Sequence, residues 1–149
     1  MSRFRPMLSA PKLEGWFAKD QITLLAPDGQ ANVIASSEPL DLEIDTEMYA
    51  KVQGDLLTKE FPGFQQFSFE HTEIFGNRPG RVRRFEWLPP DGVAIMQIQL
   101  YYAESGRGYT ATATTPSTEF GRYELELRDV LEGLAIEELA AAEAKTPSA

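Results

Sequence analysis

The chain has 149 residues, a formal net charge of −9, one histidine and no cysteine. This length suits one domain with a substantial core, so that no disulfide staple is needed. Without cysteine there is neither a thiolate nucleophile nor a cysteine zinc site, and one histidine cannot form a multi-histidine metal centre. The negative charge argues against nucleic-acid binding, which needs a basic surface. We expect a single acidic domain over residues 1–149, with no cofactor and no bound metal.

Residues 1–14 are rich in proline and charge and are predicted to form an N-terminal arm. Arg3 and Arg5 precede no apolar run of signal-peptide length. No stretch of the sequence reaches the roughly 18 apolar residues of a membrane span. We therefore expect a cytoplasmic protein with no stable membrane insertion.

A β-hairpin is predicted next, with strands over 21–26 and 31–36. Between them lies Asp28-Gly29, a pair that fits the positive φ angles of a tight turn. A two-residue loop pairs two sets of residues on one face of this hairpin: Leu24 with Val33, and Ile22 with Ala35.

An amphipathic helix of about four turns is predicted to follow. Asp45 is its expected N-cap, and Pro62-Gly63 ends it. Gly54 falls inside it and is unfavourable for a helix. Its expected inward stripe comprises Met48, Val52, Leu56 and Lys59.

Four further strands and one helix complete the predicted elements. The strands lie over 64–75, 81–88, 93–102 and 109–115, and the short Gly-rich breaks between them favour hairpins over crossovers. The helix starts near Pro116, with an apolar stripe of Phe120, Tyr123, Leu127, Val130, Leu131 and Leu134. Residues 135–149 are expected to be a flexible tail.

This order of elements predicts an α+β fold. Strands joined by hairpins, with only two helices, are typical of a twisted antiparallel sheet of about six strands with the helices packed on one face.

The strand over 93–102 indicates that the second face of the sheet is partly apolar. One of its faces is wholly apolar, whereas the other carries Ile95, Gln97, Gln99 and Tyr101. Either loops and the arm cover this second face, or it is a partner groove. Uncharged amides would suit an apolar partner that carries a few polar groups. The candidate partner-binding groove comprises Ile22, Leu24, Val33, Ile95, Gln97 and Gln99.

Three clusters of reactive or charged residues are assigned to ordinary surface. His71 shares a strand face with Glu73, as in a general base next to a carboxylate, but no serine or threonine stands out as a nucleophile. The acidic run over 38–47 lacks the spacing and glycine of a calcium loop. Arginines over 78–84 adjoin aromatic residues, as in single-strand binders, but the net charge of −9 argues against that role, and we interpret them as a solvated strand edge paired with local carboxylates.

Several segments together resemble the DcrB/PsbP-like domain. They are Gly15-Trp16 before the first strand, Pro27-Asp28-Gly29 with Asn32-Val33, Gly76-Asn77-Arg78-Pro79-Gly80-Arg81, Gln97, Tyr109-Thr110-Ala111-Thr112, and Tyr123, Leu127 and Leu131 in the last helix. The resemblance spans about residues 11–134. Within that superfamily, the size, the acidity and the lack of a leader resemble the Eag (effector-associated gene) chaperones of bacterial type VI secretion.

The resemblance implies a cytoplasmic homodimer that is not an enzyme. Its sheet would shield the N-terminal transmembrane helices of a secreted effector before export. A transmembrane helix aggregates in water, and a partly apolar groove could cover it. Two other hypotheses stay open: a monomeric regulatory module that docks a folded partner through a polar patch, and a small hydrolase that depends on His71.

Overall fold

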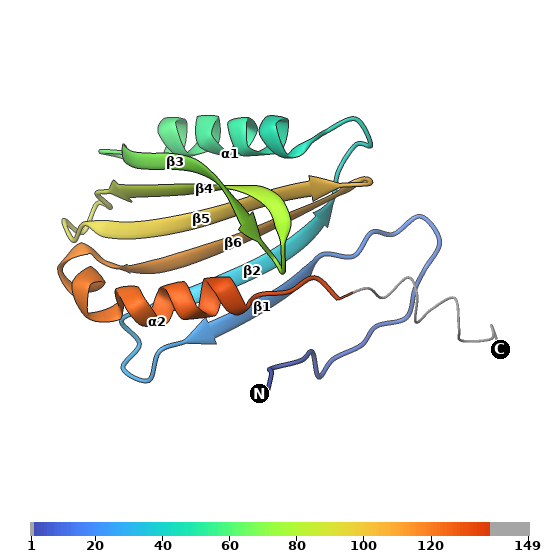
Figure 1. Cartoon of the computed structure of the whole chain (residues 1–149), viewed down its shortest axis with the longest axis horizontal. Helices are drawn as coiled ribbons and strands as arrows, with labels where there is room; N and C mark the ends of the chain where they lie inside the picture. Colours follow the sequence, from blue (N-terminus) through green and yellow to red (C-terminus); the bar gives the residue numbers. More distant parts are fainter. Residues whose placement is uncertain (1, 138–149) are drawn as a thin grey trace.

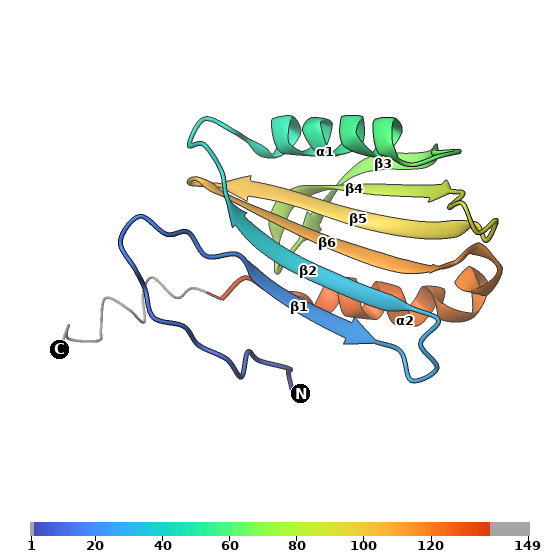
Figure 2. The same cartoon turned by 180° about the vertical axis from the view of Figure 1, so that it is seen from behind.

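A six-stranded antiparallel sheet and two helices make up the fold. The computed structural model describes residues 2–137 (Figures 1 and 2). Its elements are β1 (Asp20–Leu25), β2 (Asn32–Pro39), α1 (Thr46–Glu60), β3 (Gln65–Ile74), β4 (Arg78–Trp87), β5 (Ile95–Glu104), β6 (Arg107–Pro116) and α2 (Phe120–Gly133). The strand order is β1-β2-β6-β5-β4-β3, and every neighbouring pair is antiparallel. The predicted antiparallel α+β fold is confirmed.

The first hairpin has the register that its turn predicts. Leu24 pairs with Val33, and Ile22 pairs with Ala35. Gly29 has a φ of 74°, which a residue with a side chain rarely adopts. Residues 2–19 contain no helix or strand, and the first strand begins at Asp20. The predicted tail over 135–149 lies outside the described residues from 138 onward.

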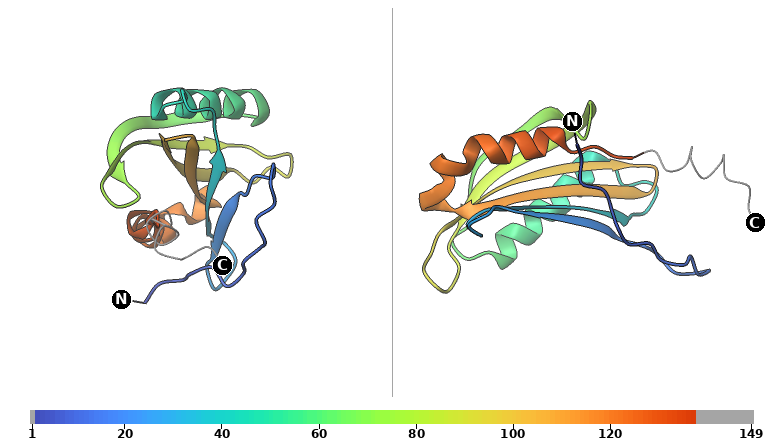
Figure 3. Two further views of the ribbon diagram at one scale, coloured as in Figure 1. Left: turned by 90° about the vertical axis from the view of Figure 1, so that its right-hand side faces the viewer. Right: turned by 90° about the horizontal axis from the view of Figure 1, so that it is seen from below.

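The two helices lie on opposite faces of the sheet, so the prediction that both pack on one face is wrong (Figure 3). The reason lies in β5, where the successive residues Leu100 and Tyr101 are both buried. Successive strand residues point to opposite faces, so both faces of this strand need a cover. α2 covers Leu100 and its neighbours, and α1 covers Tyr101. We call these the α2 face and the α1 face.

The α2 face holds the larger part of the core. The predicted stripe of α2 is confirmed, since Phe120, Tyr123, Leu127 and Leu131 are all buried in it. They pack against the apolar side chains of the central strands, namely Val33, Met96, Ile98, Leu100, Tyr102, Ala111 and Ala113. Ile74 and Phe75, at the tip of the β3–β4 hairpin, join the same cluster.

The predicted stripe of α1 does not face the sheet. Met48, Val52 and Leu56 are 48%, 52% and 42% exposed, whereas the buried residues are Tyr49, Ala50 and Leu57. The helix rests on a guanidinium and a phenol of the sheet, and small residues let it approach closely. A Cβ added at Gly54 would lie 2.5 Å from Nη2 of Arg83. The glycine that weakens the helix by about 1 kcal/mol is therefore the one that fits this contact.

The α2 stripe leads to a stability prediction. Leu127 is 5% exposed, so Leu127→Ala should lower the free energy of unfolding by roughly 2–5 kcal/mol through lost burial and a cavity. Leu125, two residues earlier, is 78% exposed, and Leu125→Ala should stay within about 0.5 kcal/mol of the wild type. Urea unfolding of the two variants measures the difference. Equal losses would mean that α2 does not present this stripe to the sheet.

Candidate functional site

The six residues of the predicted groove do not form one groove. Residues paired across an antiparallel ladder point to the same face, and Val33, Ala113 and Ile98 are paired in succession on the α2 face. Ile22 and Leu24 share that face with Val33. The other three predicted residues, Ile95, Gln97 and Gln99, alternate with Ile98 and so lie on the α1 face. Which faces of β2, β6 and β5 align across the sheet is a long-range property that alternation along a single strand does not contain.

The three predicted residues on the α2 face, Ile22, Leu24 and Val33, line a groove between α2 and β1. It has a volume of about 630 Å³, and most of its lining is apolar. Its walls and floor include Ile22, Leu24, Ala26 and Val33 from the first hairpin and Tyr123, Leu127 and Val130 from α2. We call it the α2–β1 groove. It opens at a free edge, because β1 is the last strand of the sheet on this side.

The N-terminal arm passes alongside the α2–β1 groove. Nη2 of Arg3 donates a 2.6 Å hydrogen bond to the carbonyl of Gly133, and Arg5 forms a 3.1 Å ion pair with Glu137. Phe4 and Arg5 contribute to the lining of the groove. Much of the arm is nevertheless exposed, including its large apolar side chains Phe4, Met7, Leu8, Leu13, Trp16 and Phe17. Through Phe4, the exposed apolar surface of the arm reaches the groove, a contact that local sequence patterns do not indicate.

Electrostatic contacts tie the β1–β2 turn to the first residues of α2, and so fix one end of the groove. Nη1 of Arg122 lies 3.4 Å from Oδ2 of Asp28. The N–H of Gln30 donates to Oδ1 of Asp28 at 3.0 Å. The hydroxyl of Tyr123, directed at the carboxylate, lowers the pKa of Asp28, and the Gln30 N–H and Arg122 lower it further. Ionised Asp28 therefore holds the turn against the helix.

The glutamines on the α1 face bond to the sheet itself. Gln97 donates from Nε2 to Thr114 at 2.9 Å and accepts from Nε1 of Trp87 at 3.1 Å. Gln99 donates to Thr112 at 3.1 Å and accepts from the hydroxyl of Tyr101. Threonines on β6 stand directly opposite both glutamines. These amides are thus engaged in a ladder of polar side chains, an arrangement that the pairing register alone could have revealed.

The arginines over 78–84 have two different environments. Arg78 and Arg81 pair with Glu104 and Glu47, as predicted. For Arg83 and Arg84, in contrast, no carboxylate of residues 2–137 lies within ion-pair distance. Arg84 lies over the ring of Phe120 at 4.8 Å. The prediction of pairing with local carboxylates therefore holds for only part of the cluster.

His71 is exposed on β3 and takes part in the Arg81 contacts. Nη1 of Arg81 lies 3.1 Å from Nε2 of His71 and 2.9 Å from both carboxylate oxygens of Glu47. Over residues 2–137, no three histidine, aspartate or glutamate side chains are grouped so as to hold a metal ion. None of the helices in that part of the chain is long and apolar enough to span a bilayer.

Solved structures similar to this chain share its fold. A Pseudomonas aeruginosa protein of unknown function, PA94, described as a putative regulator, aligns with a TM-score of 0.70 and 17% identity over 90% of this chain and 95% of its own. LpqN of Mycobacterium tuberculosis, involved in cell envelope biogenesis, aligns with a TM-score of 0.52 and 17% identity over 72% of this chain and 62% of its own. Cyanobacterial PsbP from Synechocystis sp. PCC 6803 aligns more weakly, with a TM-score of 0.48 and 10% identity over 83% and 95%.

No protein-family model matches the chain, and no curated protein matches its sequence. At 17% identity, the likeness to the first two structures is one of fold. What the protein does has to be argued from the site itself.

The turn at Asp28 leads to a pH prediction. Because the pKa of Asp28 is lowered from 3.8 on folding, its stabilising effect is present above that value and is lost as the pH falls through the folded pKa. Asp28→Asn should therefore lower the melting temperature at neutral pH, and this deficit should close in acid. Thermal unfolding across that range measures it, with Asp129→Asn on the exposed side of α2 as control. A deficit that persists in strong acid would contradict the role of the charge.

Proposed function

We propose that this protein is a cytoplasmic chaperone or adaptor, without catalytic activity, that shields the N-terminal transmembrane helices of a type VI secretion effector and helps to load it for export. The observation that carries the proposal is the α2–β1 groove, which is mostly apolar and opens at a free sheet edge. Accessible apolar surface of this kind costs solubility and is typical of a site for another protein segment. The sequence resemblance to the Eag chaperones supplies the class of partner.

The shape of the groove suits one face of an apolar helix. A transmembrane helix in water exposes apolar side chains all around and is driven to bury them. A helix lying in a groove inserts side chains at spacings of three and four residues along one stripe. The α2–β1 groove offers leucine, valine and isoleucine contacts from both of its walls, so it can accept such a stripe. A second surface must cover the rest of the partner helix.

We propose a second copy of the chain as the source of that surface. Phe4, one of several exposed apolar side chains of the arm, lines the groove, and β1 is an edge strand of the sheet. Two copies joined along this side would bring two grooves and two arms together around one client. The charge of −9 would keep such a protein soluble before the client arrives.

Co-expression with a client segment tests the proposed function. The client is the N-terminal segment, with its hydrophobic spans, of an effector encoded next to this gene. Leu24→Asp and Val130→Asp place a charge on the two walls of the groove and should each reduce the captured client about tenfold. Leu125→Asp, on the exposed side of α2, should capture it as the wild type does. Capture is measured by affinity pull-down from the soluble fraction.

Two controls keep this test decisive. Urea unfolding must show that each groove variant still folds, since Leu24 and Val130 also pack against the core. Gln99→Glu changes the opposite face and should leave capture intact. Wild-type capture by a folded Leu24→Asp variant would disprove the groove, and loss of capture in Gln99→Glu alone would move the binding surface to the α1 face. A monomer in light scattering, with or without client, would disprove the dimer.

A further inference from the structure

Arg83 is a buried cation at the centre of β4. The residue is 4% exposed, and among residues 2–137 it is the one charged residue in the buried class. It points from the sheet toward α1, on the face opposite to the α2–β1 groove. Taking a guanidinium out of water is costly unless its charge and its N–H groups are matched by partners.

Among residues 2–137, all the partners of the Arg83 guanidinium are neutral. Nε donates to the side-chain oxygen of Gln66 at 2.8 Å, and Nη1 donates to the hydroxyl of Tyr101 at 2.7 Å and to the carbonyl of Ala50 at 3.3 Å. The ring of Phe69 lies 4.3 Å from the guanidinium carbon. Burial raises the pKa of Tyr101 to about 12, so this phenol carries no negative charge that could balance the cation.

Arg83 thus differs from the neighbouring arginines on its strand. Arg78 and Arg81 each have a carboxylate within 3.3 Å, although both carboxylates are more exposed than Arg83. Glu47 and Asp55 line the same cavity as Arg83, and both are already engaged: Glu47 with Arg81, and Asp55 with Lys51 at 3.0 Å. No acceptor in the described part of the chain takes a hydrogen bond from Nη2 of Arg83.

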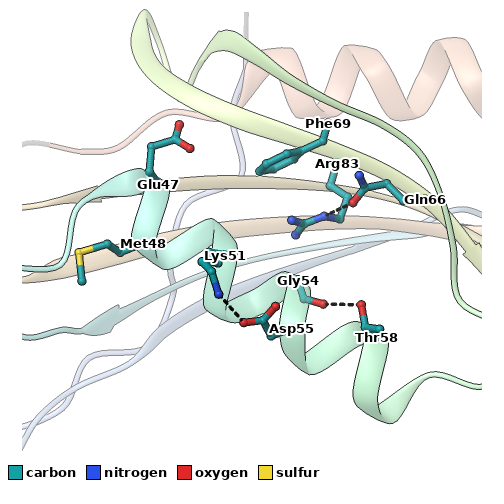
Figure 4. A pocket seen from close by; sticks show the side chains of 9 residues that line it. All are labelled: Glu47, Met48, Lys51, Gly54, Asp55, Thr58, Gln66, Phe69 and Arg83. Atoms are coloured by element: carbon teal, nitrogen blue, oxygen red, sulfur yellow. Dashed lines mark hydrogen bonds and ion pairs between the residues drawn. The ribbon is translucent and has the colours of Figure 1, made fainter.

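A cavity of about 500 Å³ adjoins this guanidinium (Figure 4). Its lining comes from α1, β3 and β4: Glu47, Met48, Lys51, Gly54, Asp55, Thr58, Gln66, Phe69 and Arg83. The close-up shows Arg83 between Gln66 and Phe69, with its head directed at α1. A Cβ at Gly54 would sit 2.5 Å from Nη2, so glycine keeps this end of the guanidinium clear. The hydroxyl of Thr58 already donates to the carbonyl of Gly54, at 3.0 Å.

We propose that this cavity is a binding site for a carboxylate on a short aliphatic stem, which pairs with Arg83. The carboxylate would supply the missing negative charge and accept hydrogen bonds from the guanidinium. Phe69 and the side chain of Met48 give the stem apolar contacts. The site is independent of the α2–β1 groove, because it lies on the other face of the sheet.

The charges around the cavity favour a carboxylate over a phosphate. Glu47 and Asp55 also line it, but each is paired with a cation of its own, Arg81 and Lys51, so that Arg83 alone leaves one unmatched positive charge. A single added negative charge is matched by Arg83, whereas the second charge of a phosphate dianion would be unmatched and would lie near the two acids. A free organic acid and a glutamate side chain of a bound protein share the chemistry of the proposed ligand.

The test is an NMR titration of the full ¹⁵N-labelled chain, which follows the side-chain Nε–H resonance of Arg83. The probes are sodium butyrate and N-acetyl-glutamate amide, with sodium chloride at equal ionic strength as the reference. We expect a saturable shift with a dissociation constant on the order of 1 mM, about −4 kcal/mol. Saturation by both probes indicates a site open to free acids, and saturation by the glutamate derivative alone indicates a protein side chain as the ligand.

Three variants show whether the shift of the Arg83 resonance arises from binding in this cavity. Gly54→Ala puts a methyl group 2.5 Å from Nη2, so the guanidinium must shift and the probes should bind at least about tenfold more weakly. The ¹⁵N spectrum of the variant must first show that it still folds. Arg83→Gln removes the cation, and the folded variant should no longer bind the probes. Backbone amide resonances of residues that line the cavity measure this loss. Lys59→Gln makes the same change in charge on α1 outside the cavity and should bind as the wild type does. No saturable shift with either probe, unchanged binding in Gly54→Ala, or tighter binding of phosphate than of butyrate would overturn the proposal.

Discussion

Two-sided burial of the central strands is the constraint on which this fold depends. In β5, every residue from Leu100 to Ala103 is buried, so side chains on both faces need a cover. The chain provides one helix for each face. The two covers differ in chemistry, because α2 brings a continuous apolar stripe whereas α1 brings small residues that rest on Arg83 and Tyr101. The sheet thus carries the larger apolar core under α2, and under α1 a smaller apolar cluster joined to a polar network.

That difference explains why some elements could be predicted from the sequence and others could not. The α2 stripe repeats at helical spacing and faces a largely apolar sheet surface, so periodicity was sufficient. The register of the first hairpin follows from its Asp-Gly turn. In α1, the best apolar stripe, with Met48 and Val52, is exposed, because the sheet beneath offers a guanidinium. A helix packed on a charge through Gly54 and Ala50 has no apolar periodicity to detect.

Only the residues of the candidate site that lie on one hairpin could be predicted to lie together. Ile22, Leu24 and Val33 share a face by local alternation along one hairpin, and the structure keeps them together in the α2–β1 groove. Whether this face also holds Gln97 depends on how β2, β6 and β5 align, which is a long-range property of the sheet. The burial of Arg83 could not be predicted from the sequence either. Arg81 and Arg84 stand on the same strand, yet one pairs with Glu47 and the other lies over the ring of Phe120. Local patterns indicate which residues share a strand face, but not what lies over that face.

The contacts of Arg3 with Gly133 and of Arg5 with Glu137 have a practical consequence for handling the protein. They bring the start of the chain beside the end of α2, next to the mouth of the α2–β1 groove. An affinity tag or fluorescent protein fused at the N-terminus would therefore stand close to the surface proposed to take the client. The β4–β5 loop, around Asp91-Gly92, lies beside the start of α2, at the opposite end of this helix from Gly133 (Figure 1). It is the better place for a label that must leave the groove accessible.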